Sequence, residues 1–309
     1  MAEIKCTVSP DDVKRVKGLG FLRDKNTSDR FNARLITRNG KLTSEELSLV
    51  AEAARVFGTG EVAMTTRMTV EIQGIPYASI EEFQAFLAKG GLVTGGTGPK
   101  VRPIVSCKGT TCTFGLIDTY ALSLKIHERF YEGYHHVTLP HKFKIAVGGC
   151  PNNCVKPDLN DLGIIGQRLV AIAEDRCRAC HNCRVENTCP MQAAALDGGQ
   201  IAINRDVCNN CGRCVSACPF GALDGKSVGY RVYIGGRWGK KTARGIPLSR
   251  ILTSEEDLLS LVEKALLLFR EQGVAGERFA DTVARIGFER AESILLSDEI
   301  LARKDAILA

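Results

Sequence analysis

The sequence predicts an α+β fold in which a small cysteine-rich domain is inserted into a larger α/β domain. Strand-like alternation and helix start signals follow each other up to about residue 90. Twelve of the thirteen cysteines lie between residues 107 and 218. The composition changes at both edges of the segment that holds most of them. We therefore expect domains at 1–93, at 94–173 together with 226–309, and at 174–225.

The first expected elements are a strand and a helix. Residues 31–38 alternate between apolar and polar side chains, as a half-buried strand does. Thr43-x-x-Glu46 is a capping box, in which each side chain can satisfy a free backbone N–H of the first helical turn. It predicts a helix that runs to about Phe57.

A second strand and helix follow. Residues 61–73 predict one strand, and Ser79-x-x-Glu82 predicts the start of a helix that ends at Gly90. This run resembles half of a ferredoxin-like βαβ unit, and the glycine-rich stretch 90–98 is expected to be a linker.

The remaining elements surround the cysteines. The expected order is a helix to about Tyr131, a strand with Lys142 and Lys144, strands at 162–173 and near 229–235, and a helix from Thr253-x-x-Glu256 to about Gln272.

Composition and charge narrow the class of protein. The chain has 309 residues, enough for two domains with real cores. No apolar run approaches the roughly 20 residues of a membrane span, and Met1–Gly20 has no signal-peptide pattern, so we expect a cytoplasmic protein. The net charge of +6 could suggest nucleic acid, but the basic residues are dispersed and aromatic residues are only 6%. We expect no nucleic-acid partner.

Eight cysteines have the spacing of a bacterial ferredoxin that holds two [4Fe-4S] clusters. Two runs of three closely spaced cysteines each end in a Cys-Pro pair, and in such proteins the fourth cysteine of each run serves the other cluster. One set would be Cys177, Cys180, Cys183 and Cys218, and the other Cys208, Cys211, Cys214 and Cys189. Zinc is the first alternative, but its sites use cysteine pairs or Cys/His sets. Disulfides are the second, and they need an oxidising compartment.

The other four cysteines fall in a longer motif. Residues 148–164 contain Gly-Gly-Cys-Pro-Asn-Asn-Cys followed by Val-Lys-Pro-Asp, and this segment resembles the sirohaem–iron–sulfur signature of the sulfite and nitrite reductase family. The resemblance implies a third [4Fe-4S] cluster, with Cys154 also bridging to the sirohaem iron. Its implied ligands are Cys107, Cys112, Cys150 and Cys154. Four residues separate the first two cysteines, where the family usually has five.

The resemblance extends over nearly the whole chain and is strongest to the small anaerobic sulfite reductase type. It implies that sulfite or nitrite is held by basic side chains, and that Arg237 in a glycine-rich loop binds the cofactor. The implied anion-binding residues are Arg34, Arg67, Lys142 and Lys144. The two lysines are two apart on the expected strand and so share a face. A solvated face is the alternative for them.

Three functions compete. The first is reduction of sulfite to sulfide with six electrons, and the second is reduction of nitrite by the same cofactors. The third is electron transfer by an iron–sulfur protein without sirohaem. Two arginines and two lysines suit the sulfite dianion better than the nitrite monoanion.

A few other residues have patterns that are less specific for a role in the site. Arg38 shares the strand face of Arg34 and could replace it, and His141 is a reserve proton donor. Cys6 is expected to be a free thiol, and Trp238 to pack on the cofactor or in the core.

Full-length relatives contain two copies of this half, so we expect a homodimer or larger complex and a separate electron-donor protein.

Overall fold

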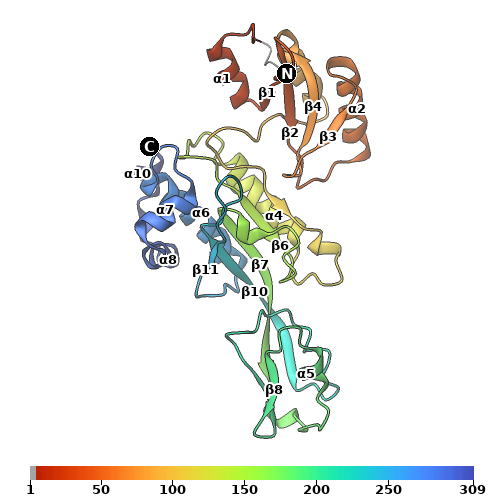
Figure 1. The fold of residues 1–309 in the computed structure, drawn as a ribbon, viewed down its shortest axis with the longest axis vertical. Helices are drawn as coiled ribbons and strands as arrows, with labels where there is room; N and C mark the ends of the chain where they lie inside the picture. The colour runs from red at the N-terminus through yellow and green to blue at the C-terminus, as the bar shows by residue number, and fades with distance from the viewer. Residues whose placement is uncertain (1–4) are drawn as a thin grey trace. The chain divides into compact units, whose positions relative to one another are not determined.

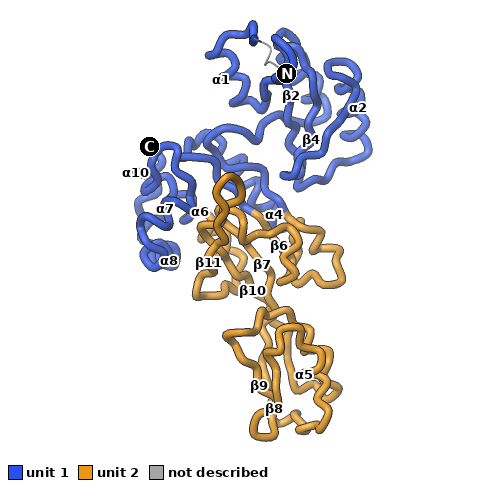
Figure 2. Tube along the Cα trace, in the orientation of Figure 1, with its two compact units in different colours: residues 1–105, 121–145, 264–309 blue, residues 106–120, 146–263 orange. Residues whose placement is uncertain are grey.

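The computed structural model describes residues 5–309, so the first four residues of the expected domain 1–93 lie outside the described residues. The chain divides into two compact units (Figure 2). Unit 1 comprises residues 1–105, 121–145 and 264–309, and unit 2 comprises residues 106–120 and 146–263. Along residues 5–309, no helix is long and apolar enough to cross a membrane.

The N-terminal part of unit 1 is an antiparallel sheet with helices packed on it (Figure 1). The strand order is β1-β2-β4-β3. The strands are β1 (Phe21–Arg23), β2 (Arg30–Leu35), β3 (Val62–Met64) and β4 (Val70–Pro76), and the helices are α1 (Pro10–Gly18), α2 (Ser44–Phe57) and α3 (Ile80–Ala88). Phe31, Ala33 and Leu35 alternate into one core with apolar residues of α2 and α3. The opposite face of β2 therefore carries Asn32 and Arg34.

The capping box of α2 is confirmed, whereas two neighbouring predictions are wrong. The backbone N–H of Glu46 donates to Thr43 Oγ1 at 3.2 Å, and the N–H of Thr43 donates to Glu46 Oε2 at 2.7 Å. Residues 61–73 form two strands, because the chain reverses at residues 65–69, where Met68 has φ of 58°. Ser79 makes no capping hydrogen bond, since the short 3₁₀ turn Tyr77–Ser79 precedes α3.

Residues 90–98 are part of unit 1 and are held in place by hydrogen bonds, so they do not form a free linker. The N–H of Gly95 donates to the carbonyl of Arg34 at 3.0 Å. The N–H of Gly96 donates to the Tyr131 hydroxyl at 3.0 Å. A Cβ on Gly95 would lie 2.6 Å from that hydroxyl, so the close approach requires glycine.

A second sheet has the strand order β11-β10-β7-β6-β5. Its strands are β5 (Val105–Ser106), β6 (Ile145–Gly148), β7 (Leu162–Ile172), β10 (Leu223–Ile234) and β11 (Ile246–Pro247). The long antiparallel pair β7–β10 leads from this sheet into the cysteine-rich segment (Figure 1). The return strand begins at Leu223, earlier than the sequence predicted.

The cysteine-rich segment lies between β7 and β10. It contains the hairpin of β8 (Ala194–Asp197) and β9 (Gln200–Ile203) and the short helix α5 (Arg184–Thr188). Its core is small, and half-buried cysteines pack against it with Val185 and Ile201. Such a core gives little burial on its own, so a cofactor that crosslinks the loops would add stability.

The other helices complete the fold. They are α4 (Thr119–Ile126), which continues into a π-helical turn (His127–Glu132), and α6 (Glu255–Gln272), α7 (Phe279–Ile286), α8 (Phe288–Leu296), α9 (Glu299–Ala302) and α10 (Lys304–Leu308). The cap of α6 is one residue later than predicted, because Ser254 Oγ accepts the N–H of Asp257 at 3.3 Å. In unit 1, the rings of Phe143, Phe269 and Phe279 pack together.

Candidate cofactor and anion sites

Cys107, Cys112, Cys150 and Cys154 are brought together in unit 2. Burial raises the pKa of the Cys150 thiol, and the neighbouring thiols of Cys107, Cys154 and Cys112 raise it further. The N–H of Cys107 donates to the carbonyl of Val147 at 3.1 Å, which joins the segment after β5 to β6. A cationic cluster held by these four cysteines would offset the cost of ionising the Cys150 thiol.

The loop around Cys107 is tightly packed. The N–H of Gly149 donates to Cys107 Sγ at 3.2 Å. A Cβ on Gly149 would lie 2.9 Å from Gly109 Cα and 3.5 Å from Cys107 Sγ. Hydrogen bonds to the sulfurs are typical of iron–sulfur sites and help to set the reduction potential.

Cys154 differs from the other three thiols in exposure. It is exposed, while Cys107, Cys112 and Cys150 are half-buried. Asp158 holds the loop that carries Cys154, because Asn153 Nδ2 donates to it at 2.8 Å and Arg244 Nη1 at 2.5 Å. Cys154 is therefore the member of the group that is most accessible from outside it.

A second group of four forms in the cysteine-rich segment. Burial raises the pKa of the Cys214 thiol to about 11, and Cys208, Cys211 and Cys189 contribute by their proximity. This set takes its fourth member from the other cysteine run. The N–H of Asn210 donates to Cys208 Sγ at 3.4 Å and that of Ala193 to Cys189 Sγ at 3.3 Å.

The remaining set has a parallel arrangement. Cys177, Cys183 and Cys218 pack against the same small core, and Cys180 is half-buried. The N–H of Ala222 donates to Cys218 Sγ at 3.4 Å, four residues after the cysteine, as Ala193 does for Cys189.

The thiol groups fit cubane clusters in their chemistry. Within residues 5–309, no three His, Cys, Asp or Glu side chains converge on one point closely enough to hold a single metal ion. A cubane needs no such convergence, because each of its four thiolates binds a different iron. The close grouping, the half-burial and the backbone N–H donors to sulfur are what such a cluster requires.

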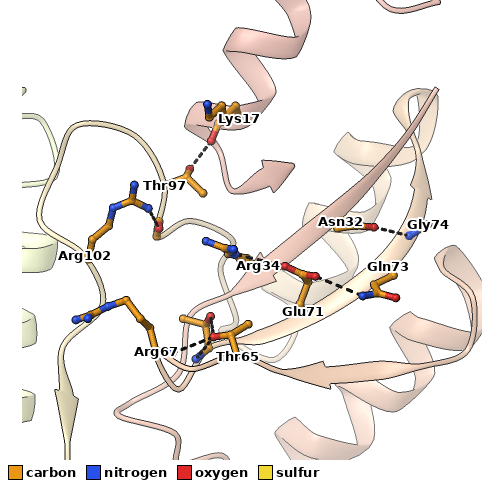
Figure 3. A network of polar contacts seen from close by, with 12 residues as sticks. Lys17, Asn32, Arg34, Thr65, Arg67, Glu71, Gln73, Gly74, Thr97 and Arg102 are labelled. Carbon is orange, nitrogen blue, oxygen red and sulfur yellow. Dashed lines mark hydrogen bonds and ion pairs between the residues drawn. The ribbon is translucent and has the colours of Figure 1, made fainter. Parts of the chain in front are cut away.

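A basic cavity of about 210 Å³ lies in unit 1. All four anion-binding residues expected from the sequence line it, together with one arginine that the sequence analysis missed: Arg34, Arg67, Lys142, Lys144 and Arg102. Figure 3 shows the three arginines, which come from β2, from the β3–β4 turn and from the segment after residue 98. Five cations around one small cavity favour an anionic ligand.

The three arginines are held differently. Arg34 Nε lies 3.4 Å from Glu71 Oε2, so a carboxylate partly balances its charge. Arg67 donates to the carbonyl of Pro103 from Nε at 3.2 Å and from Nη2 at 2.7 Å, and to that of Ile145 from Nη2 at 3.1 Å. Arg67 thus braces the backbone of the cavity wall.

Arg102 carries a strongly perturbed charge. Its Nη1 donates to the carbonyl of Gly96, and its Nε is buried with no hydrogen-bond partner among the described residues. Burial, and then the positive charge of Arg34, lowers the pKa of Arg102 to about 10. An anion bound in the cavity would stabilise the charged form of Arg102 and so offset the cost of burying it.

The two lysines precede β6 and do not lie within a regular strand. Phe143 between them pairs with Val101, as its carbonyl accepts from the N–H of Arg102 at 2.8 Å. Phe143 and Ile145 are fully buried, while Lys142 and Lys144 are half-buried. The predicted alternation therefore holds, and both lysines line the cavity.

Several weaker candidates lie elsewhere. Arg38 pairs with Glu46 at 2.5 Å, beyond the cavity lining. His141 Nδ1 accepts the N–H of Lys142 at 2.7 Å. Burial, and then the nearby positive charges, lowers the pKa of His141, so a smaller fraction of its imidazole carries a proton to donate.

Two further expectations concern the glycine-rich loop. Arg237 lies in this loop after β10 and exchanges two backbone hydrogen bonds with Ala243, at 2.8 and 2.9 Å. Trp238 is 63% exposed, so the packing of its ring in the core is excluded. Cys6 is a half-buried free thiol.

Comparison with known proteins places the chain in a family. Residues 97–300 match the model of the nitrite and sulphite reductase 4Fe-4S domain, and residues 23–90 match the nitrite/sulfite reductase ferredoxin-like half domain. The chain belongs to the nitrite and sulfite reductase family. The two models together cover β2, β3 and β4, the five basic residues of the cavity and all twelve grouped cysteines.

Two curated relatives illustrate the range of the family. The coenzyme F420-dependent sulfite reductase of Methanocaldococcus jannaschii is 32% identical over 247 residues, which are 79% of this chain and 38% of that protein. A subunit of the anaerobic sulfite reductase of Salmonella typhimurium is 31% identical over 229 residues, which are 66% of this chain and 64% of that relative. The chain thus spans less than two thirds of the length of each.

A solved structure has the same α+β fold. The crystal structure of dissimilatory sulfite reductase I aligns with a TM-score of 0.71 at 22% identity, over 87% of this chain and 69% of that one. The predicted mixed α+β fold is confirmed at this level.

Proposed function

We propose that this chain reduces sulfite to sulfide with six electrons at a sirohaem that Cys154 joins to a [4Fe-4S] cluster. The observation that carries the proposal is the pair of sites described above. One is a group of four adjacent thiols with one exposed member, and the other is a cavity lined by five cations. Both compared relatives are named sulfite reductases, which supports the choice of reaction.

Cysteine and arginine side chains would hold the cofactors. Cys107, Cys112, Cys150 and Cys154 would hold the cluster, and Arg237 would contact the macrocycle of the sirohaem. When bound, sirohaem would supply a redox-active iron for the reduction, and the cluster would supply electrons to it.

The basic residues bind and orient the anion. The oxygens of sulfite leave as water, so each must be protonated while its charge is held in place. Lys142 and Lys144 can donate protons and hold charge, since each ammonium has three N–H donors. Arg34 and Arg102 hold charge with planar guanidinium groups that can donate two hydrogen bonds in parallel, and Arg67 fixes the cavity wall.

The cysteine-rich segment would be an inserted ferredoxin with two more [4Fe-4S] clusters. The grouping of Cys208, Cys211 and Cys214 with Cys189 supports the exchange of fourth ligands that such ferredoxins have. This brings the proposed total to three clusters and one sirohaem. A separate protein would donate electrons to the segment.

The direct test is turnover by the cofactor-loaded chain with each anion. Reduced methyl viologen supplies electrons, and sulfide or ammonia is measured. Sulfide from sulfite at a higher kcat/KM than ammonia from nitrite is the expected result. Faster reduction of nitrite would assign the same site to the smaller anion. A loaded chain that has clusters but no red absorption band and no turnover would be an electron carrier.

We also propose that two copies share their sites. The basic cavity of one subunit would face the sirohaem bound at Cys154 of the other, because full-length relatives contain two copies of this half. A twofold dimer is the commonest closed assembly. The test mixes two inactive variants, Cys154→Ser and the double variant Lys142→Ala/Lys144→Ala. Sites shared between subunits recover one working site for each mixed dimer, and no recovery despite proven subunit exchange would reject the sharing.

A further inference from the structure

A cavity in unit 2 joins two of the three cysteine groups. It has a volume of about 270 Å³, and its lining includes Cys150 of the first group and Cys211 of the group with Cys189. Among the described residues, no member of the set Cys177, Cys180, Cys183 and Cys218 lines it. One ferredoxin-type group is therefore adjacent to the first group at this cavity, and the other is not.

Arg168 of β7 fastens the nearer loop. Its backbone N–H donates to the carbonyl of Asn210 at 2.8 Å. Its side chain packs so closely on Gly212 that a Cβ there would lie 2.3 Å from Arg168 Cδ. A Cβ on Gly225 of β10 would lie 2.9 Å from the same atom. The position of Arg168 thus requires glycine at 212, whereas Gly225 is also confined by Val215, whose Cγ2 would lie 2.5 Å from a Cβ there.

A second contact, between Phe114 and Arg213, also lines this cavity. The guanidinium of Arg213 lies over the ring of Phe114, 5.4 Å from its centroid. Phe114 belongs to the loop that follows Cys112, and Arg213 lies between Cys211 and Cys214. An exposed cation–π pair is weak alone, but it adds to the packing of Arg168 and restricts the same loop.

We propose that Arg168 and the Arg213–Phe114 pair form an electron junction, at which the cluster of Cys208, Cys211, Cys214 and Cys189 passes electrons to the first cluster. This inference rests on the proposed function, since it needs the clusters to be present. Each transfer moves one electron, oxidises the nearer ferredoxin cluster and reduces the first cluster, with no bond made or broken. The reductant is a low-potential one-electron donor that acts at the Cys177 set, and dithionite takes its place in the test.

The first experiment identifies the adjacent cluster by its magnetic interaction with the first cluster. Cofactor-loaded Cys211→Ser and Cys180→Ser variants, each altered in one ligand of one ferredoxin group, are reduced with dithionite. We expect the spin–spin broadening of the first cluster's electron paramagnetic resonance signal to be lost or altered in Cys211→Ser and kept in Cys180→Ser. The opposite pattern would overturn the order.

The second experiment keeps all twelve thiols. Gly212→Ala and its control Gly221→Ala both place alanine at a positive φ, of 73° and 66°, within four residues of a cluster cysteine. Only the first meets Arg168, whereas a Cβ on Gly221 has ordinary contact with Arg176 Nη1 at 3.9 Å. Displacing the loop should slow reoxidation of the ferredoxin clusters by sulfite severalfold in Gly212→Ala alone. Equal reoxidation rates in the two variants would refute the role of Arg168 in the electron junction.

A third experiment guards against a failure of Gly212→Ala to assemble. Phe114→Ala/Arg213→Ala removes the cation–π pair from the surface and leaves every glycine and thiol in place. It should weaken the spin–spin broadening while the iron content stays equal to that of the parent. Unchanged broadening would exclude the pair from the junction. A parent chain with too little iron or no red band would refute the proposed function instead, so the two failures are distinguishable.

Discussion

Substitution of Arg102 by glutamine separates anion binding from structural support. The fall in the pKa of Arg102 from its ordinary value to about 10 corresponds, at about 1.36 kcal/mol per pKa unit, to a cost of about 3 kcal/mol for the charged side chain. Arg102→Gln removes that cost but also the charged donor to the carbonyl of Gly96, worth about 1.5–3 kcal/mol. The free energy of unfolding should therefore stay unchanged or rise by up to about 2 kcal/mol.

The same substitution should weaken sulfite binding. Loss of a charge-assisted hydrogen bond of about 1.5–3 kcal/mol predicts a KM for sulfite raised by about 10- to 100-fold. Steady-state sulfide production and the thermal midpoint of the loaded protein measure the two effects. Arg102→Lys is the control that keeps the charge and loses the planar fork. A KM within about twofold of the parent's, together with lower stability, would show that Arg102 only supports the fold and would refute the reasoning.

Three further outcomes follow from the contacts. Arg67→Gln should lower the free energy of unfolding by about 2 kcal/mol, because it leaves buried carbonyls without their donor, and a thermal midpoint equal to the parent's would contradict this. Cys154→Ser should abolish sulfite turnover and the coupling between haem and cluster in the paramagnetic spectrum, while the ferredoxin clusters persist; full turnover would exclude the bridge. Hydrogen bonding by Arg285 holds the pKa of Glu277 at about 2, below its usual 4.5. The stabilisation that ionised Glu277 gives is therefore present above about pH 4.5 and lost as the pH falls toward about 2. The decrease in the free energy of unfolding caused by Glu277→Gln should be full at about pH 7 and smaller at about pH 4. An equal loss at both would contradict the assignment.

Local sequence signals were sufficient where the local chemistry is decisive. The Thr43 capping box places the start of α2 because both hydrogen bonds lie within one turn. Fixed spacing grouped the cysteines, since a short run can reach one cluster in few ways. The alternation around Phe143 placed both lysines at the cavity although they do not lie within β6.

Other features depended on contacts that local patterns do not contain. The β3–β4 turn has neither glycine nor proline, and its reversal relies on Met68 at positive φ and on the hydrogen bond from Thr65 N–H to the carbonyl of Thr69 at 2.9 Å. Arg102 precedes Pro103 in an unremarkable stretch, and its role is visible only through its burial beside Arg34. The junction at Arg168 likewise needs a glycine far along the chain.

Anaerobic iron and sulfide analysis with an optical spectrum tests the central claim most directly. Three [4Fe-4S] clusters and one sirohaem predict about thirteen irons per chain and an absorption band in the red, which clusters alone lack. Iron removal by a chelator should remove both signals and lower the thermal midpoint. About eight irons per chain without a red band would leave only the two ferredoxin clusters and would contradict the catalytic account.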